Sequence, residues 1–454
     1  MVPLPHARRL SPATDSAVRR RFYLHCLGSL RSLHGLGERV PGIDRYSERA
    51  LLLAFEGDAV CVPQPVDPDY LAFLGGLGIG PRPEHIVVPN GNGRSVARPL
   101  AERLLGDPGV LSRAARALGA AAVTIEPYAA TPEVMALAEV MERDSGIPVR
   151  VDGSPRITRY VDQKHHVRAK AQELGIPVAE GEVAELAFAG GRRRRDLEPV
   201  RAAIERQLRH TGRVIVRGAS GASGSSTFVV GRGGEDTGGV LRRIAARTDN
   251  RIYLVEAMVE ATVSPNVQIH VPPDGGPLTC VGVTDQRWAR GLTHSGNQLP
   301  SSARTVEAME AWARILATWM RSQGFTGLAG FDFVEYRDPT TGGPRAILAE
   351  VNPRVNGGTY PLAVRARLNA AAAGAGRPQA PAFVSGTVDT RAASFARVRA
   401  AIGHLLFDPD RGTGVVPYAT GCLEYGKCAL VALGRSRLKA AELYGAAQAR
   451  LEAA

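Results

Sequence analysis

The sequence has few cysteines, and their spacing gives no sign of a disulfide framework. It contains 5 cysteines in 454 residues, an odd number with no CxxC pair. Its first residues, MVPLPHARRLSPATDS, lack the apolar stretch of a secretory signal, and no apolar run approaches the length of a membrane span. We therefore expect a cytoplasmic protein with reduced thiols and no transmembrane role.

Acidic residues are outnumbered by basic ones, and the excess comes mainly from arginine. The formal charge is +12, and residues 191–196 read GRRRRD. Such a charge suggests a nucleic acid or a phosphorylated ligand. The chain shows no RRM, zinc-finger or basic-zipper pattern that would organise the charge, so arginines spread over solvated surfaces are the favoured interpretation. We expect no nucleic-acid partner.

The composition, with 44% hydrophobic and 22% charged residues, is that of a globular protein long enough for about three domains. Residues 1–160 alternate short apolar runs with helical stretches, which predicts a parallel sheet in an α/β domain. No GxGxxG follows the first clear strand, so nothing indicates a dinucleotide site. The strands are expected at 50–58, 85–89, 121–127 and 149–153, and the helices at 98–106 and 131–146.

A region of mixed strands and helices begins near residue 160. Its first helix ends at Gly175, where Ile-Pro-Val leads into a strand. The elements that follow do not alternate strictly, which is typical of α+β domains. Residues 365–389 are rich in Ala, Gly and Pro and are expected to be partly mobile. Further strands are expected within 214–230 and at 251–259, 266–271, 278–288, 330–336, 346–352, 414–418 and 426–434, with helices at 198–210, 304–324 and 436–454.

A glycine- and serine-rich loop, GASGASGSST at residues 218–227, joins two of these strands. A Walker A loop or a Rossmann loop would open a helix, so neither fits. Backbone N–H groups in a flexible loop between antiparallel strands can close over phosphates. An ordinary hairpin loop has the same composition and is an equally good interpretation.

Polar side chains interrupt two apolar strands near the end of this region. Glu350 and Asn352 lie two residues apart, so they share one face of a strand, and Arg354 follows closely. Asp332 lies between apolar residues in GFDFVEY. Carboxylate and amide oxygens suit Mg²⁺, and an arginine beside them can bind a phosphate. In the alternative interpretation, Asp332 caps a turn and Glu350 pairs structurally with Arg354.

The order of these motifs along the chain resembles that of the ATP-grasp superfamily. The family's first nucleotide-binding lysine, on the helix before a GIPV-like turn, corresponds to Lys164. Arg217 stands where a second lysine usually ends the strand before the flap; arginine keeps the charge but is larger and planar. The resemblance implies that the flap contacts ATP through Gly221, Ser223, Gly224 and Ser225.

The same resemblance assigns the adenine, ribose and metal positions. Glu256 and Val259 match a linker whose carboxylate and backbone receive the adenine, and Glu260 or a neighbour is expected to hold the ribose. The family's metal ligands and active-site arginine correspond to Asp332, Glu350, Asn352 and Arg354. The implied cofactors are ATP and Mg²⁺, for which Mn²⁺ can substitute.

Other segments resemble the pheganomycin-type peptide ligases of actinobacteria. They are the front domain, SPNVQIHV (264–271), GLTHSGNQLPS (291–301) and the terminal GVVPY and GCLEYGKCALVALG stretches. The resemblance implies a mixed α/β plus α+β fold: a pre-ATP-grasp domain, an ATP-grasp fold of two α+β subdomains and a small C-terminal α+β appendage. The expected domain limits are 1–160, 161–260, 261–385 and 386–454.

The implied reaction is ATP-dependent peptide-bond formation through an acyl phosphate, in which a guanidino-bearing amino acid is joined to the N-terminus of a peptide. Two alternatives stay open: an amino-acid ligase that makes dipeptides, and a non-catalytic nucleotide- or nucleic-acid-binding protein. Arg354 and the NGG turn with Gly357 and Gly358 are expected to stabilise the reacting group. The oligomeric state stays open, and a homodimer is suggested only by analogy with related ATP-grasp ligases, which are often dimeric.

The remaining prediction concerns recognition of the substrates. The sequence contains no Ser-His-Asp or Cys-His arrangement, and the implied mechanism needs no protein nucleophile. A loop histidine is more often a solvent-facing turn residue than a ligand contact. The residues predicted to bind the substrates are Arg287, Arg290, His294, Asn297 and Asn356.

Overall fold

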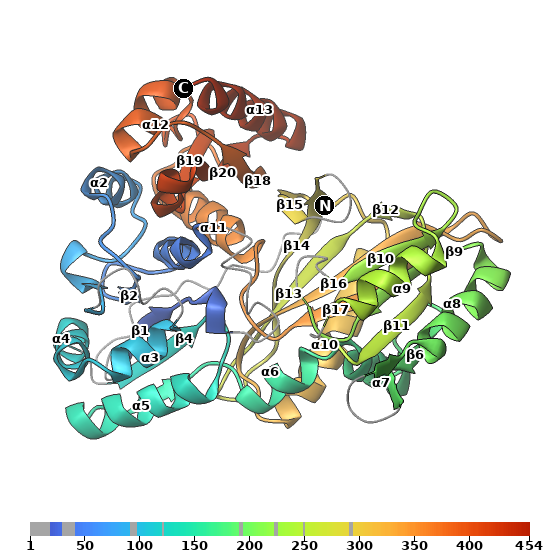
Figure 1. Cartoon of the computed structure of the whole chain (residues 1–454). Helices are drawn as coiled ribbons and strands as arrows, with labels where there is room; N and C mark the ends of the chain where they lie inside the picture. The colour runs from blue at the N-terminus through green and yellow to red at the C-terminus, as the bar shows by residue number, and fades with distance from the viewer. Residues whose placement is uncertain are drawn as a thin grey trace.

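Three large β-sheets and the helices around them make up the protein (Figure 1). The structure is a computed structural model, and it describes residues 19–29, 41–90, 98–119, 122–189, 194–221, 226–247, 250–289 and 294–454. No helix in these ranges is long and apolar enough to cross a membrane. One sheet belongs to the N-terminal third, one to a small lobe, and the largest extends to the C-terminus.

The N-terminal sheet has five parallel strands, as its alternating pattern predicts. One expected strand is wrong: the apolar run at 50–52 ends a 3₁₀ helix, η3 (Ile43–Leu52), because a short buried run fits either structure. In spatial order, the strands are β3 (Ile86–Val87), β2 (Ala59–Cys61), β1 (Arg19–Leu24), β4 (Ala122–Pro127) and β5 (Val149–Val151). The helices are α2 (Pro68–Gly76), α3 (Leu100–Leu105), α4 (Pro108–Leu118), α5 (Pro132–Ser145) and α6 (Pro155–Val161).

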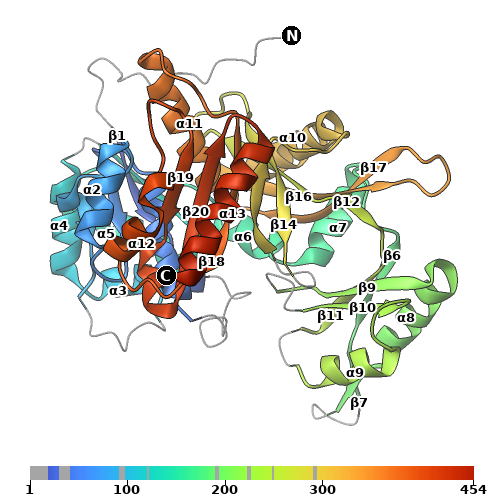
Figure 2. The same ribbon diagram turned by 90° about the horizontal axis from the view of Figure 1, so that it is seen from above.

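A four-stranded antiparallel sheet forms a lobe that projects from the rest of the chain (Figure 2). Its core includes Val214, Phe228 and Tyr253 from the sheet. The strands, in spatial order, are β10 (Thr227–Gly231), β9 (Arg213–Gly218), β11 (Ile252–Ala257) and β6 (Gly181–Glu185). The covering helices are α8 (Glu198–Thr211) and α9 (Thr237–Ala245), and a small hairpin pairs β7 (Ala187–Ala189) with β8 (Arg194–Asp196).

The largest sheet has nine strands, and one face of its β13 region packs against helices. Alternate residues of β13, such as Val267 and Ile269, pack against α7 (Lys164–Glu173) and α10 (Val306–Ser322) in one core. The opposite face of the same strands is polar, as period-2 geometry requires. The strands are β12 (Ala261–Val263), β13 (Pro265–Val271), β14 (Thr279–Trp288), β15 (His294–Leu299), β16 (Gly327–Arg337) and β17 (Pro344–Asn352), followed by β18 (Ala382–Asp389), β19 (Gly414–Tyr418) and β20 (Lys427–Gly434).

The C-terminal strands continue this sheet, because β18 pairs with β15. Residues 365–389, expected to be partly mobile, instead lie mostly in β18 and in helix α11 (Thr359–Gly374). Alanine is the strongest helix former, and Leu368 and Ala372 are buried. The remaining helices are α12 (Phe395–Ile402) and α13 (Arg437–Ala453). Of the expected domain limits, residue 160 falls within α6 and residue 386 within β18.

Candidate active site

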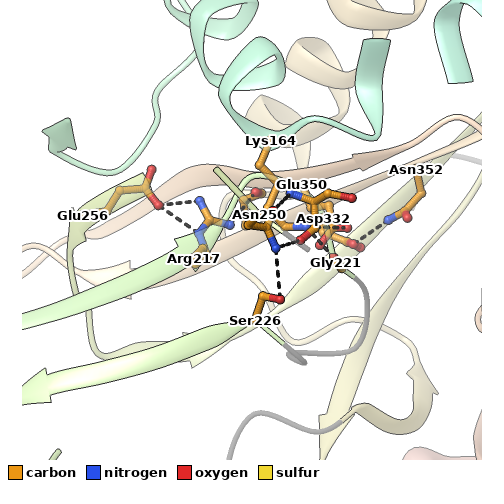
Figure 3. Close-up of polar contacts among 11 residues, drawn as sticks. Lys164, Arg217, Gly221, Ser226, Asn250, Glu256, Asp332, Glu350 and Asn352 are labelled. Atoms are coloured by element: carbon orange, nitrogen blue, oxygen red, sulfur yellow. Dashed lines mark hydrogen bonds and ion pairs between the residues drawn. The ribbon is translucent and has the colours of Figure 1, made fainter. Parts of the chain in front are cut away.

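The polar face of the large sheet brings Asp332 and Glu350 together (Figure 3). They are directly paired residues on β16 and β17. Asn352 lies on the same strand as Glu350, and its Nδ2 donates to Asp332 Oδ2 at 2.8 Å. Asp332 therefore lies within a strand and caps no turn, which disfavours the structural alternative for this residue.

Amide side chains surround Asp332 and donate hydrogen bonds to its carboxylate. Its Oδ1 accepts hydrogen bonds from Asn266 Nδ2 and Gln286 Nε2, each at 2.6 Å. Burial, and then the neighbouring carboxylate of Glu350, raise the pKa of Asp332 to about 7. A divalent cation would relieve both effects, because it neutralises adjacent carboxylates and replaces lost hydration. The residues thus suit Mg²⁺ through two carboxylates and the Oδ1 of Asn352.

A β-bulge positions this part of β17. Asp332 pairs with Glu350 and Phe333 pairs with Leu348, which leaves Ala349 without a partner on β16. The carbonyl oxygen of Ala349 instead accepts a hydrogen bond from Arg217 NH1 at 2.8 Å. The bulge therefore links β17, the strand of Glu350 and Asn352, to the small lobe.

Lys164 connects the flap to the candidate metal site. It is the first residue of α7, and its Nζ donates to the carbonyl oxygen of Gly221 at 2.7 Å. The same Nζ lies 3.6 Å from Oε1 of Glu350. A cation in this position can hold a polyphosphate beside the metal, as the family resemblance predicts. The predicted flap residues Ser223, Gly224 and Ser225 lie outside the described residues.

Arg217 and Glu256 form a buried ion pair. Nε and NH2 of Arg217 donate to Glu256 Oε2 at 2.9 and 2.5 Å, and Arg168 NH1 donates to Glu256 Oε1 at 2.6 Å. Arginines thus contact both carboxylate oxygens, and the Glu256 side chain positions Arg217. The expected contact of this carboxylate with adenine stays a prediction. Val259 is half-buried and Glu260 exposed in the turn that follows β11.

The base of the flap is held by a residue that the sequence interpretation missed. The side chain of Asn250 accepts from Ser220 N at 2.7 Å and donates to Ser220 O at 2.8 Å. Its Nδ2 also lies 3.3 Å from Oγ of Ser226, so both described ends of the flap meet at one amide. A buried asparagine just before a strand gave no pattern that would reveal this role.

Arg354 turns toward the N-terminal domain. Its NH1 donates to Oη of Tyr128 at 3.1 Å, and its guanidinium lies 5.0 Å from the centre of the Tyr128 ring. In the described part of the chain, the ion-pair partner of Glu350 is Lys164, so the structural pairing of Glu350 with Arg354 is absent. Arg354 still lies close enough to lower the pKa of Asp332, although burial outweighs this effect.

The NGG turn is more constrained than the sequence suggests. Gly358 N donates to Oδ1 of Asn356 at 3.0 Å, and Asn356 N donates to Oγ1 of Thr359 at 3.0 Å. These two N–H groups serve the turn before α11. The expected role of the NGG backbone toward the reacting group stays a prediction. Within the described ranges, no acceptor meets the N–H of Gly357. A Cβ at Gly357 would lie 3.1 Å from the His294 ring, so the turn packs closely on β15.

The predicted substrate residues separate into two groups. His294 and Asn297 lie on the site face beside the NGG turn, and burial lowers the pKa of His294. Arg287 points away: its NH1 donates to Ser385 O at 3.1 Å, and it stacks on Tyr444 of α13 at 4.7 Å. Arg287 therefore has structural contacts with β18 and α13, and its contact with the substrate stays a prediction. Arg290 lies outside the described residues.

A row of amides on the site face was not recognised from the sequence. Gln268 Nε2 donates to Oδ1 of Asn356 at 3.0 Å, and Asn356 Nδ2 lies 3.3 Å from Oδ1 of Asn266. Asn266 and Gln268 alternate with buried valine and isoleucine in PNVQIHV, so the period-2 pattern could have placed them beside Asp332.

Comparisons with known proteins agree with this architecture. Residues 47–142 match the family model of the pre ATP-grasp domain. No curated protein matches the sequence significantly. The N5-carboxyaminoimidazole ribonucleotide synthetase of Thermus thermophilus has a similar structure, with 13% identity and a TM-score of 0.53 over 95% of this chain and 99% of that one. The Aspergillus clavatus N5-carboxyaminoimidazole synthase, in complex with ADP and 5-aminoimidazole ribonucleotide, has 13% identity and a TM-score of 0.52 over 95% and 97% of the two chains.

At these identities the likeness concerns the fold. Both structures align over nearly the whole chain. The predicted fold class is confirmed: the chain consists of a pre-ATP-grasp domain with a parallel sheet, followed by an ATP-grasp fold with antiparallel sheets.

Proposed function

We propose that the protein is an ATP-dependent carboxylate–amine ligase that releases ADP and phosphate. The main support is the convergence of Lys164 with the Asp332 and Glu350 pair on one face of the sheet. A non-catalytic binding module has no need of hard-metal ligands beside a phosphate-binding cation. The similar structures include one with ADP and a small amine-bearing ribonucleotide, which suits this class of reaction.

Each residue has a distinct role in this proposal. Asp332, Glu350 and Asn352 would hold Mg²⁺, which when bound neutralises phosphate charge. Lys164 and the flap backbone hold the β- and γ-phosphates, while Arg217 keeps the lobe in register with β17 through the Ala349 carbonyl. Arg354 offers its guanidinium to the developing charge, oriented by Tyr128.

The proposed chemistry proceeds in two steps. A substrate carboxylate oxygen attacks the γ-phosphorus and ADP leaves, giving an acyl phosphate. The amine then attacks the carbonyl carbon, loses a proton, and phosphate leaves as the amide forms. Flap closure over the nucleotide would exclude water from the reactive anhydride.

The proposed identity of the two substrates follows from the sequence resemblance. The acid is a guanidino-bearing amino acid, and the acceptor is the N-terminal amine of a peptide. A cytoplasmic location and a homodimer belong to the same proposal. An amino-acid ligase that makes dipeptides would use the same residues and differ in its acceptor.

A screen for nucleotide products tests the proposal. Purified full-length protein is given ATP, Mg²⁺, a fixed pool of peptides and one carboxylic acid at a time. We expect at least one acid to give ADP and phosphate, with a mass-spectrometric product equal to acid plus amine minus water. Release of AMP and pyrophosphate would overturn the acyl-phosphate mechanism. Steep salt-dependent binding of RNA or DNA, without acid-dependent ADP release, would support the binding-protein alternative.

A further inference from the structure

The carboxyl edge of the N-terminal parallel sheet faces the candidate active site. The spatial order of the strands is β3-β2-β1-β4-β5. The chain therefore adds β2 and β3 on one side of β1 and β4 and β5 on the other, and the direction reverses between β1 and β4. Open parallel sheets bind ligands at the carboxyl ends of the strands beside such a reversal. Tyr128 follows β4 at this edge, and Asp152 follows β5.

A cavity of about 670 Å³ lies at this edge. Its wall includes Tyr128 and Asp152 from the N-terminal domain, Arg354 after β17, and Ala363, Ala366 and Ala370 of α11. Its volume is within the range of small-molecule sites, and most of its lining is apolar. Because Arg354 lines the cavity and also acts electrostatically on Asp332, the cavity adjoins the proposed reaction centre.

Most charged groups in the wall already have partners. Arg21 forms an ion pair with Glu126. Arg367 donates to the carbonyl oxygens of Ala54 and Leu53 at 2.6 and 2.9 Å, and it stacks on Phe55 at 4.0 Å. These groups shape the cavity without needing a ligand.

Asp152 is different. It is only 8% exposed, yet among the described residues it has no ion-pair partner, and its one side-chain hydrogen bond is a long contact of 3.4 Å from Oγ1 of Thr326. His270 also lines the cavity, and burial lowers its pKa, so near neutral pH it supplies little positive charge. A buried carboxylate without a cation at ion-pair distance carries a desolvation cost. The guanidinium of Arg150 acts on Asp152 only from beyond that distance, so a ligand cation would stabilise this carboxylate.

We propose that this cavity binds a substrate of the ligase through a cationic side-chain group, an ammonium or a guanidinium, that pairs with Asp152. The apolar wall takes the aliphatic or aromatic stem, and Arg354 takes an anionic end of the same molecule. This proposal rests on the proposed function for the identity of the molecule as a substrate. Occupancy of the cavity by a cation can be tested without turnover.

The test is calorimetric titration of the full chain with pairs of amino acids that are similar in size and differ in side-chain charge. L-arginine and L-citrulline differ in the charge of the terminal group, and L-lysine and L-norleucine differ likewise. We expect each cation to bind about tenfold or more tightly than its neutral counterpart. The arginine and lysine arms show whether a guanidinium or an ammonium is preferred.

Two variants test whether the preference for cationic ligands depends on the carboxylate of Asp152. Asp152→Asn should remove the preference, while Asp144→Asn, on the exposed surface of α5, should retain it. Equal affinities for charged and neutral ligands, no binding of either cation at millimolar concentration, or an unchanged preference in Asp152→Asn would overturn the proposal. If Asp152→Asn fails to fold, the comparison of charged and neutral ligands on the wild-type protein still tests the proposal. Titration with MgATP is run in parallel, so that failure of nucleotide binding counts against the proposed function alone.

Discussion

Arg217 illustrates how one side chain can serve two partners at once. Its planar guanidinium donates to Glu256 with two nitrogens and to the Ala349 carbonyl with the third. A lysine ammonium can hold the carboxylate but has no fixed fork that reaches both acceptors. The departure from the usual lysine is therefore coupled to the bulge in β17 and to the buried carboxylate.

Arg217→Lys should keep the charge and lose the link to Ala349. We expect the affinity for ATP to fall by no more than about tenfold, on the order of 1.4 kcal/mol, because Lys164 still supplies a phosphate contact. Calorimetric titration with MgATP measures this. Arg251→Lys, in an exposed ion pair with Glu185, serves as the control. Complete loss of ATP binding in Arg217→Lys alone would show that Arg217 itself holds the phosphates.

His25 provides a pH prediction. It is fully buried, its Nδ1 lies 3.0 Å from Oη of Tyr360, and burial lowers its pKa to about 3. The unfolded chain binds a proton near the ordinary pKa of 6.5 and the native chain does not. Stability from this group is therefore complete above about pH 6.5 and is lost as pH falls toward about 3, by about 1.4 kcal/mol per pH unit.

Urea unfolding of wild type and His25→Gln at about pH 7 and about pH 5 measures this effect. His25→Gln should lose about 2 kcal/mol less stability than wild type between the two conditions. His210→Gln, at an exposed position in α8, should keep the wild-type dependence. The same pH dependence in all three proteins would contradict a neutral buried His25.

At the scale of elements, the turn between β17 and α11 depends on close packing against β16. A Cβ at Gly330 would lie 2.0 Å from Nδ2 of Asn356 and 3.0 Å from Nδ2 of Asn266. Both amides belong to the polar face that holds Asp332. The turn and the sheet must therefore keep glycine at this contact.

Gly330→Ala should displace Asn356 and lower the free energy of unfolding by about 1–3 kcal/mol, as overpacking does. The matched control is Gly374→Ala at the end of α11, where a Cβ would meet nothing within 4 Å. This control should be neutral or stabilising by up to about 1 kcal/mol, because alanine favours the helix. Chemical denaturation distinguishes the two, and equal effects would show that Gly330 has room for a side chain.

Local periodicity in the sequence could predict part of these elements, whereas features that depend on contacts between distant segments could not be predicted. Period-2 alternation placed Glu350 and Asn352 on one face, and the structure has them there. The bulge at Ala349 has no recognisable pattern in the sequence. The two arginines that contact Glu256 come from separate elements far apart in the chain, so no local pattern predicts them. The run at 50–52 was misassigned because buried helices and strands share short apolar segments.

At the scale of the whole molecule, the two ends of the chain share a hydrophobic core. Residues of η3, α11 and the C-terminal strands pack in one cluster. Glu48 of η3, buried in this region, accepts hydrogen bonds from Thr420 N, Thr420 Oγ1 and Gly421 N at 2.6, 2.7 and 2.9 Å. The C-terminal part is therefore built into the N-terminal domain, a relation between segments over 370 residues apart that no local pattern shows.

Glu48→Ala should lower the free energy of unfolding by about 2 kcal/mol, because three buried donors lose their acceptor. Urea unfolding followed by circular dichroism and by tryptophan fluorescence measures it, and both transitions should shift together. Glu452→Ala, at the exposed end of α13, should change stability by less than about 0.5 kcal/mol. An unchanged free energy of unfolding in Glu48→Ala would contradict the role of this carboxylate in joining η3 to the C-terminal part.

The most direct measurement is acid-dependent ADP formation by wild type, Glu350→Ala and Asn352→Ala, with Glu307→Ala on the exposed surface of α10 as the control. Circular dichroism verifies that each variant is folded. We predict that wild type and Glu307→Ala release ADP only when a carboxylic acid is present, and that both site variants lose this activity. Retained turnover in either Glu350→Ala or Asn352→Ala would remove that residue from the metal site and contradict the proposed ligase mechanism.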